Sequence, residues 1–451
     1  MKYSCQFICQ NSPLFAQVIY FTSISFAGYA FLKVFKPQEK PPMKDLDLLF
    51  TSVSASTVSS MSTVEMEDFS STQLWMLAIL VLVGGEVFTS MLGLHFMKAK
   101  FDTIKGSVNK AGSSFYVDVE SINSENSGPN RIQGAKVTVP MSGLRLGNQD
   151  QVEPKTIEYL GYALMVYLLV TNLGSSLAIY IYLRLVPDAQ EVLKRKGIGY
   201  AIFSVFTAIS SVGNCGFTPA NENMIIFQKN TILLLLIIPQ ILSGNTLFAP
   251  CLRFMMWSIK KITGKEEYDF ILRHPEAVRF KHLMNSRECV YLMITVISFI
   301  ITQTILFCSL EWNSEALQEM NSYQKIVGAL FLSVNARHAG ESIVDLSSLS
   351  SSILVLYTIM MYLPGYTSFL PKDGEKHYNA GMNDKRRNVC ENWILSQLSY
   401  LAIFVVLICI TEREAMTTDP LNFNVFSITF EVIRQVFKID CIVQRAHDYH
   451  Y

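Results

Sequence analysis

The chain has 451 residues, half of them hydrophobic, and its 37 basic and 37 acidic residues give a formal net charge of zero. This composition and the positive mean hydropathy are unusual for a soluble enzyme, and the lack of a basic domain gives no reason to expect nucleic-acid binding. The nine cysteines are scattered without a CxxC pair or a histidine at metal spacing. We therefore expect neither a zinc site nor a disulfide framework, and no cofactor.

Long apolar runs indicate a membrane protein. A helix needs about 20 apolar residues to cross the hydrocarbon core, and about seven windows meet that criterion. They are Leu14–Phe35, Leu74–Phe96, Ile157–Val186, Ile225–Ile259, Val290–Leu310, Ile353–Leu370 and Leu395–Thr411. The first run follows only Lys2 and lacks a clear small-residue cleavage site, so we interpret it as a retained helix rather than a signal peptide. These runs predict an all-α, multi-pass integral membrane protein.

Charged loops set the expected orientation. Basic residues gather in three loops that each follow an even-numbered span, at 97–155, 260–287 and 371–391. By the positive-inside rule these loops are cytoplasmic, which places the N-terminus in the cytoplasm as well. The opposite side is less regular, because the segment Pro187–Gly199 also carries Lys194, Arg195 and Lys196.

A polar turn interrupts the apolar sequence at Ser204–Met224, where the run Val205–Val212 gives way to Gly213, Asn214, Cys215 and Gly216. Taken alone, this stretch is either a loop between two helices or a turn buried at membrane depth. Backbone outside a helix is tolerated at that depth only when protein or a watery cavity surrounds it. Similar stretches begin at Asp45 and Lys325, and a fourth is expected from Asn422. The recurrence favours a re-entrant segment in each repeat.

The repeat predicts how the chain is divided. Each unit comprises a span, a short re-entrant segment, a second span and a cytoplasmic loop. The predicted units are 1–96, 156–259, 288–370 and a partial fourth unit at 392–433, followed by a divergent tail at 434–451. The expected fold is therefore a set of membrane-pore-membrane units around a central cation pore, with the fourth unit incomplete.

The re-entrant turns have the chemistry of a cation filter. A short helix that ends inside the membrane directs the negative end of its dipole at the following turn, and extended carbonyls can replace the water shell of an ion. Gly216 and Gly340 suit such a backbone, and the equivalent position in the first unit is Ser60. Ser59, Asn214, Cys215 and Ala339 are their immediate neighbours. The only metal expected is an alkali cation, held transiently at the filter carbonyls.

Acidic residues follow each turn, among them Glu65, Glu222 and Glu341. Their repeated placement favours a ring that concentrates cations at the pore mouth, although each one alone could be an ordinary solvated loop charge. Glu86 lies within the second span, where it either pairs inside the bundle or takes part in transport.

Four further residues could act near the pore. Arg337 and His338 precede Gly340, and we expect them to anchor the third turn. Pro364 and Gly365 interrupt the sixth span and form either a gate or only a bend.

At these residues the sequence resembles the plant high-affinity potassium transporter (HKT) family of the Trk/Ktr superfamily. The stretches that carry the likeness are SVSASTVSSMSTVEMED, SVGNCGFTPANENMIIF, VNARHAGESIVDLS, IPQILSGNTLF and MMYLPGYT. The resemblance implies four units around one pore, with filter residues Ser60, Gly216 and Gly340 in the first three. Serine in the first filter implies the sodium-selective subgroup, passive transport of Na⁺ with K⁺ as the other candidate ion, and location in the plasma membrane. It also suggests a homodimer embedded in the lipid bilayer.

The likeness ends at Ile433, since no glycine follows it and the tail is too short to span. We hypothesise an alternatively spliced, C-terminally truncated form or a gene-prediction artefact. Two functions follow: a passive sodium transporter or channel, or a non-conducting isoform that acts, if at all, as an interfering subunit. An enzyme is not favoured, because the histidines do not pair with Cys, Asp or Glu at catalytic spacing within any span.

Overall fold

The computed structural model describes residues 13–35, 43–96, 98, 154–275, 280, 282–314 and 317–362, together with a few positions between 404 and 433. Within these ranges the regular structure is helical and contains no strand. The predictions made for most of the loop 97–155, for Pro364 and Gly365, for the loop 371–391, for most of the partial fourth unit and for the tail lie outside the described residues.

The first unit consists of an outer helix, a short helix and a bent inner helix. Their bounds are α2 (Pro13–Val34), α3 (Asp45–Ser56), the 3₁₀ turn η1 (Met66–Asp68), α4 (Ser71–Gly84) and the segment Glu86–Phe96. α4 begins at a capping box, in which the Ser70 side chain accepts from the Gln73 amide and the Gln73 side chain accepts from the Ser70 amide. The inner helix bends by 55° between Gly84 and Glu86.

The second unit repeats this order with additions at both ends. It contains α6 (Pro154–Leu185), α7 (Pro187–Lys196), α8 (Tyr200–Val212), η2 (Ile225–Phe227), α9 (Thr231–Gly244), α10 (Phe248–Thr263) and α11 (Glu266–Arg273). α7 begins with a proline, whose fixed φ suits a first helical turn, and ends at Gly197 in the left-handed conformation. α9 and α10 form a second broken pair, with a bend of 88°.

The third unit contains α13 (Ser286–Glu311), α14 (Ser322–Asn335), η4 (Leu346–Ser348) and α15 (Ser351–Tyr362). Capping boxes at Asn285 and Asn321 define where α13 and α14 begin. In each of these three stretches a long helix is followed by a short helix, a turn and an inner helix.

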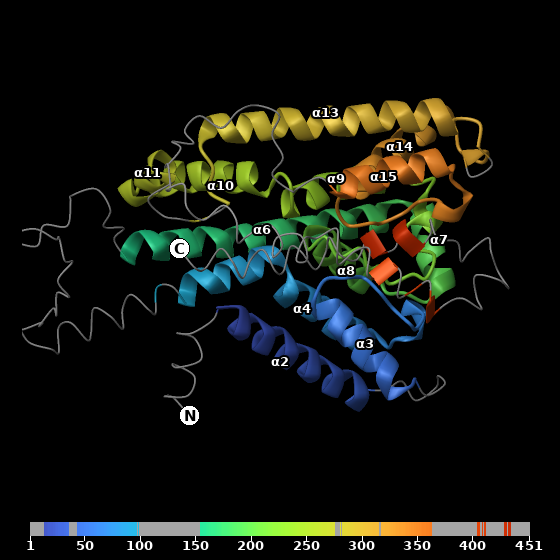
Figure 1. Cartoon of the computed structure of the whole chain (residues 1–451), viewed down its shortest axis with the longest axis horizontal. Helices are drawn as coiled ribbons and strands as arrows, with labels where there is room; N and C mark the ends of the chain where they lie inside the picture. The colour runs from blue at the N-terminus through green and yellow to red at the C-terminus, as the bar shows by residue number, and fades with distance from the viewer. Residues whose placement is uncertain are drawn as a thin grey trace, which may run out of the picture.

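Long helices lie outside and short ones inside. Among the described residues, two helices, Thr156–Leu185 and Ser286–Glu311, are long and apolar enough to cross a membrane, or up to four if each bent pair counts as one span. In Figure 1 α6 and α13 both lie nearly horizontal, with α9 and α10 drawn between them, and both expose large apolar side chains such as Leu173 and Ile305. In α8, by contrast, nearly every residue from Ile202 to Val212 is buried. Side chains of this kind on a long helix are suited to contact with lipid, while α8 is surrounded by protein.

Three apolar cores hold the units together. The first combines α2, α3 and α4 with Ile202, Phe206 and Ile209 of α8, so the second short helix packs directly on the first unit. The second joins α8 and α9 with α14 and α15. The third lies between α6, α10 and α11, away from the turns. The short helix of one unit is thus fixed by its neighbour, which keeps the turns in register.

Candidate functional site

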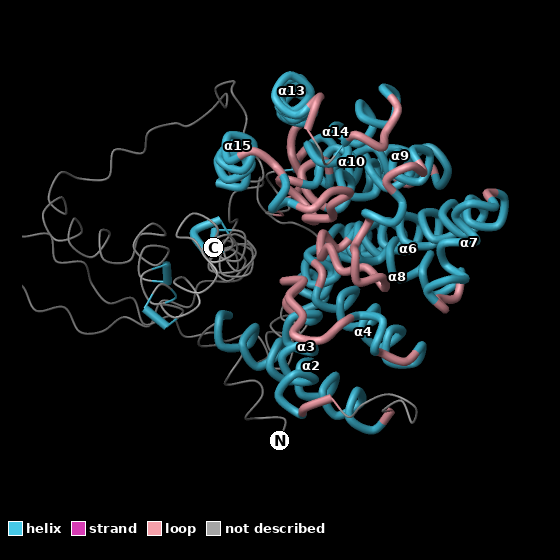
Figure 2. Tube along the Cα trace, turned by 90° about the vertical axis from the view of Figure 1, so that its right-hand side faces the viewer, coloured by secondary structure: helices cyan, strands magenta, loops and turns pink. Residues whose placement is uncertain are grey.

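Three short helices, α3, α8 and α14, end in turns inside the fold. We call these turns, 57–65, 213–224 and 336–345, the filter loops. Each one folds back so that an amide of the loop donates to a carbonyl of the helix end: Ser59 to Ser54 at 2.9 Å, Cys215 to Ser210 at 2.8 Å and Gly340 to Asn335 at 3.1 Å. Figure 2 shows the loops that follow α3, α8 and α14 gathered in the centre of the molecule. The structure therefore brings together three segments that are far apart in sequence.

The three predicted filter residues all have a positive φ. Their φ angles are 57° at Ser60, 86° at Gly216 and 78° at Gly340. Glycine reaches this region without a steric penalty, whereas a serine there is uncommon. The pairing of Ser60 with Gly216 and Gly340, which rested on counting residues, thus coincides with an equivalence in backbone geometry.

A second repeated feature supports the same register. Two residues after each predicted filter position, a hydroxyl side chain donates to the carbonyl two residues further on. The pairs are Ser62 with Val64, Thr218 with Ala220 (2.9 Å) and Ser342 with Val344. The sequence analysis missed this device, although a hydroxyl at the same offset in all three loops was a visible signal. These bonds hold the exits of the loops in one shape.

The loops approach one another at Gly216. A Cβ placed on this glycine would lie 2.0 Å from the Ala339 carbonyl oxygen and 3.7 Å from Ser60 Oγ. The second loop is therefore in contact with the backbone of the third loop and within reach of the first. Only a glycine fits here, since both the space and the φ angle exclude a side chain.

Two glycines of the inner helices lie against the C-terminal ends of the short helices α3 and α8. A Cβ on Gly84 would lie 1.9 Å from the Ser56 carbonyl oxygen, and one on Gly244 would lie 1.8 Å from that of Val212. In both units the inner helix touches the last turn of the short helix, four residues before the filter position, and bends immediately afterwards. These close approaches position the turns against the broken spans.

The predicted neighbours of the filter residues have local partners. Ser59 Oγ lies 3.1 Å from Ser54 Oγ, and Cys215 and Ala339 are fully buried. Asn214 also has a positive φ of 54° and donates from its side chain to the Val212 carbonyl at 3.3 Å. These residues shape the loops behind the filter positions.

Of the acidic residues, Glu341 is buried rather than placed at an open mouth. Its side chain is 1% exposed, and its Oε1 accepts from Ser211 Oγ at 2.8 Å. Its amide donates to Asn335 Oδ1 at 3.1 Å. The carboxylate of Glu341 thus joins the third filter loop to α8.

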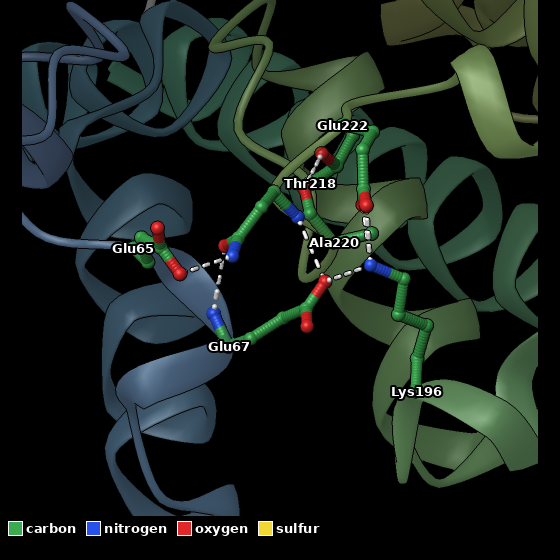
Figure 3. A network of polar contacts seen from close by, with 7 residues as sticks. Glu65, Glu67, Lys196, Thr218, Ala220 and Glu222 are labelled. Atoms are coloured by element: carbon green, nitrogen blue, oxygen red, sulfur yellow. Dashed lines mark hydrogen bonds and ion pairs between the residues drawn. The ribbon is translucent and has the colours of Figure 1, made fainter.

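Glu65 and Glu222 belong to a network of polar contacts between the first and second units, which Figure 3 shows. We call Glu65, Glu67, Lys196, Asn221 and Glu222 the mouth network. Asn221 Nδ2 donates to Glu65 Oε2 at 2.7 Å, and Lys196 Nζ lies 2.7 Å from Glu222 Oε2 and 3.0 Å from Glu67 Oε1. Hydrogen bonds with Lys196 hold the pKa of Glu222 below its ordinary value, while those with Glu222 and Glu67 raise the pKa of Lys196.

The remaining candidates also have partners. His338 Nε2 lies 2.9 Å from Thr246 Oγ1, at the break between α9 and α10, and its Nδ1 lies 2.5 Å from the Val334 carbonyl. The Arg337 guanidinium lies over the Phe299 ring. Glu86 Oε1 is 3.7 Å from His282 Nε2. His338 and Arg337 are thus placed where they can anchor the third loop, and Glu86 faces a partner inside the bundle.

Carbonyl and hydroxyl oxygens dominate the chemistry of this site. Among the described residues, no group of three or more His, Cys, Asp or Glu side chains is arranged to hold a metal ion. What the loops offer is backbone oxygen at the ends of short helices, which suits a weakly held alkali cation.

Comparisons with known proteins agree with this geometry. Residues 145–370 match the TrkH family, described as a cation transport protein. The chain is 68% identical to Cation transporter HKT1;3 of Oryza sativa subsp. japonica, over 96% of this chain and 81% of that protein. It is 45% identical to Sodium transporter HKT1 of Arabidopsis thaliana, over 89% of this chain and 78% of that protein.

A solved structure has the same fold. The crystal structure of the potassium transporter TrkH from Vibrio parahaemolyticus superposes with a TM-score of 0.50 at 10% identity, over 95% of this chain and 83% of that chain. Together these matches confirm the family and the helical membrane fold predicted from the sequence. The chain therefore belongs to the HKT family of plant cation transporters, which are integral membrane proteins of the Trk type and not enzymes.

Proposed function

We propose that this HKT protein carries Na⁺ passively, along a path between the three filter loops and through a filter of Ser60, Gly216 and Gly340. The observation that carries the proposal is the shared positive φ of these residues, together with the approach of Gly216 to Ala339 and Ser60. The sodium transporter named among its relatives supports Na⁺ as the principal ion. K⁺ is the competing ion.

The mechanism needs no covalent step. The carbonyl ends of α3, α8 and α14 direct negative partial charge at the loops, and loop carbonyls substitute for the ion's water shell. The membrane potential supplies the driving force, since one elementary charge gains about 2.3 kcal/mol per 100 mV. The first filter loop differs from the other two because Ser60 adds a Cβ and a hydroxyl, which change the space and the ligands available to the ion.

The same proposal includes the orientation of the chain in the membrane and the surfaces that face lipid. We place the filter loops and the mouth network on the extracellular side of the plasma membrane, with the N-terminus in the cytoplasm. Exposed apolar residues of α6 and α13 would face lipid or a second copy of the chain in a homodimer. Pro364 and Gly365 stay a predicted gate.

Voltage clamp of cells that express the chain tests the proposal. We expect an inward current in Na⁺ whose reversal potential shifts by about 59 mV per tenfold change in external Na⁺. Gly216→Arg should abolish this current while the protein still reaches the cell surface, because the new side chain cannot fit beside the Ala339 carbonyl. A Gly216→Arg variant with normal current would show that ions do not pass this loop.

A further inference from the structure

Lys196 is held between two units. It is the last residue of α7, and its ammonium lies 3.0 Å from Glu67 Oε1 of the first unit and 2.7 Å from Glu222 Oε2 of the second (Figure 3). The Lys196 side chain is 24% exposed, whereas that of its neighbour Arg195 is 71% exposed and pairs with Glu191 within α7. Of these two adjacent cations, only Lys196 contacts the loops.

The carboxylates around Lys196 are themselves fixed. The Asn221 amide donates to Glu67 Oε1 at 3.2 Å, and the Glu67 amide donates to Asn221 Oδ1 at 3.1 Å. The Asn221 side chain also donates to Glu65. The Glu67 oxygen that receives the ammonium is therefore held in place by Asn221 of the second unit.

The position of this cluster relates it to the ion path. Glu67 follows Ser60 by seven residues, and Glu222 follows Gly216 by six. The mouth network thus lies at the exits of two filter loops and contains three carboxylates with one ammonium. Removing the positive charge of Lys196 would leave a strongly negative surface beside the path.

We propose that Lys196 is a tethered counter-ion, which occupies the Glu67 and Glu222 carboxylates and so sets how strongly the mouth holds cations from solution. This inference rests on the proposed function, because it assumes that cations pass the filter loops. With Lys196 present, a divalent cation has to displace a covalently attached competitor. Without it, the Glu67 and Glu222 carboxylates offer the oxygen ligands that Ca²⁺ prefers.

The test compares Lys196→Gln with Arg195→Gln, which removes the same charge from the adjacent residue without touching the mouth network. At low ionic strength we expect Lys196→Gln to raise the Na⁺ current about twofold to fourfold at subsaturating Na⁺, through a higher local cation concentration. Ca²⁺ added at millimolar levels should then inhibit this variant, in the range where weak extracellular calcium sites bind. Arg195→Gln should behave like the unchanged chain.

Two further variants separate charge from loop structure. Lys196→Arg should preserve resistance to Ca²⁺, because it keeps the charge. The exchange Lys196→Glu with Glu222→Lys returns a cation to the network from the opposite side and should restore most of that resistance. Failure of both variants to resist Ca²⁺ would overturn the counter-ion role.

A readout that does not need transport completes the test. Purified Lys196→Gln protein should be stabilised against heat by Ca²⁺, and the unchanged chain and Arg195→Gln should not. Equal stabilisation of all three would overturn the inference even if Na⁺ transport is normal. Absence of Na⁺ current in the unchanged chain would instead count against the proposed function, while the Ca²⁺ stabilisation would still decide the role of Lys196.

Discussion

At the scale of single residues, Ser60 combines a chemical difference with a conformational cost. Its φ of 57° matches the region occupied by Gly216 and Gly340. An L-residue in the left-handed region costs roughly 1 kcal/mol relative to glycine. A serine is kept there despite this cost, which is understandable if its hydroxyl or its Cβ contributes to ion selection.

Ser60→Gly should separate the two effects. The backbone already suits glycine, so the loop should keep its shape and the protein its stability. Removing the Cβ and hydroxyl gives the first filter loop a glycine like the other two, and we expect K⁺ permeability to rise relative to Na⁺. Reversal potentials in Na⁺ and K⁺ solutions measure this ratio.

Ser59→Ala is the matched control for that experiment. It removes a hydroxyl from the adjacent residue, whose Oγ is bonded inside the loop to Ser54. We expect this variant to keep the permeability ratio of the unchanged chain. If Ser60→Gly also leaves the ratio unchanged, Ser60 does not belong to the filter.

At the scale of elements, the fit of each inner helix on a short helix depends on one missing side chain. A Cβ at Gly84 or Gly244 would collide with a backbone carbonyl rather than with a movable side chain. Such overpacking typically costs about 1–3 kcal/mol. Gly84→Ala and Gly244→Ala should therefore lower the melting temperature of the purified protein and reduce transport together.

Gly174 of α6 provides the comparison. A Cβ there meets nothing within 4 Å, and alanine is the better helix former. Gly174→Ala should leave the melting temperature unchanged or raise it. A similar loss of stability in all three variants would mean that the close approaches at Gly84 and Gly244 have no special role.

The sequence predicted those helices whose positions depend on the length of an apolar run or on a polar turn. Apolar length predicted α2, α6 and α13, and the polar turn after Val212 predicted where α8 ends. The bends at Gly84 and Gly244 were not predicted, although Gly84-Gly85 and Ser243-Gly244 are pairs of the kind at which helices kink. The close approach of these glycines to Ser56 and Val212 depends on residues distant in the sequence.

The same limit applies to the candidate site. Counting along the repeat paired Ser60 with Gly216 and Gly340, and all three have a positive φ. It could not reveal that Lys196, which departs from the charge rule for loops, is held by carboxylates of two units. Nor could it reveal that Glu341 is buried against Ser211, since both facts depend on tertiary packing.

At the scale of the whole molecule, the two junctions between units differ in chemistry. The second and third units join through buried hydrogen bonds, from Ser211 to Glu341 and between Thr246 and His338, and through an exposed ion pair of Lys229 with Glu319. The first and second units join through an apolar core and at the mouth network, which is charged and partly exposed. The exposed ion pairs, unlike the buried hydrogen bonds, are expected to weaken as salt is added to the surrounding solution.

The pKa shifts define the range of pH in which the mouth network is intact. The pKa of Glu222 is lowered from its ordinary 4.5, so its pairing contributes stability above that value and is lost as pH falls through the lower folded pKa. The pKa of Lys196 is raised from 10.5, so its contribution is present below that value and is lost as pH rises through the higher folded pKa. The pair should therefore persist throughout the interval between 4.5 and 10.5.

This interval predicts how the protein responds to external acid. Between about pH 7.5 and 5.5 both groups keep their charges, so the ratio of Lys196→Gln current to unchanged current should stay constant. Lys196 is the main cause of the lowered pKa of Glu222, so in the variant Glu222 binds a proton at a higher pH than in the unchanged chain. As pH falls toward the ordinary value of 4.5, the variant therefore loses negative charge first, and the ratio should fall. Currents recorded at stepped external pH, with Arg195→Gln alongside, measure both ranges. A change in the ratio near pH 6 would contradict this account, because neither Glu222 nor Lys196 titrates there.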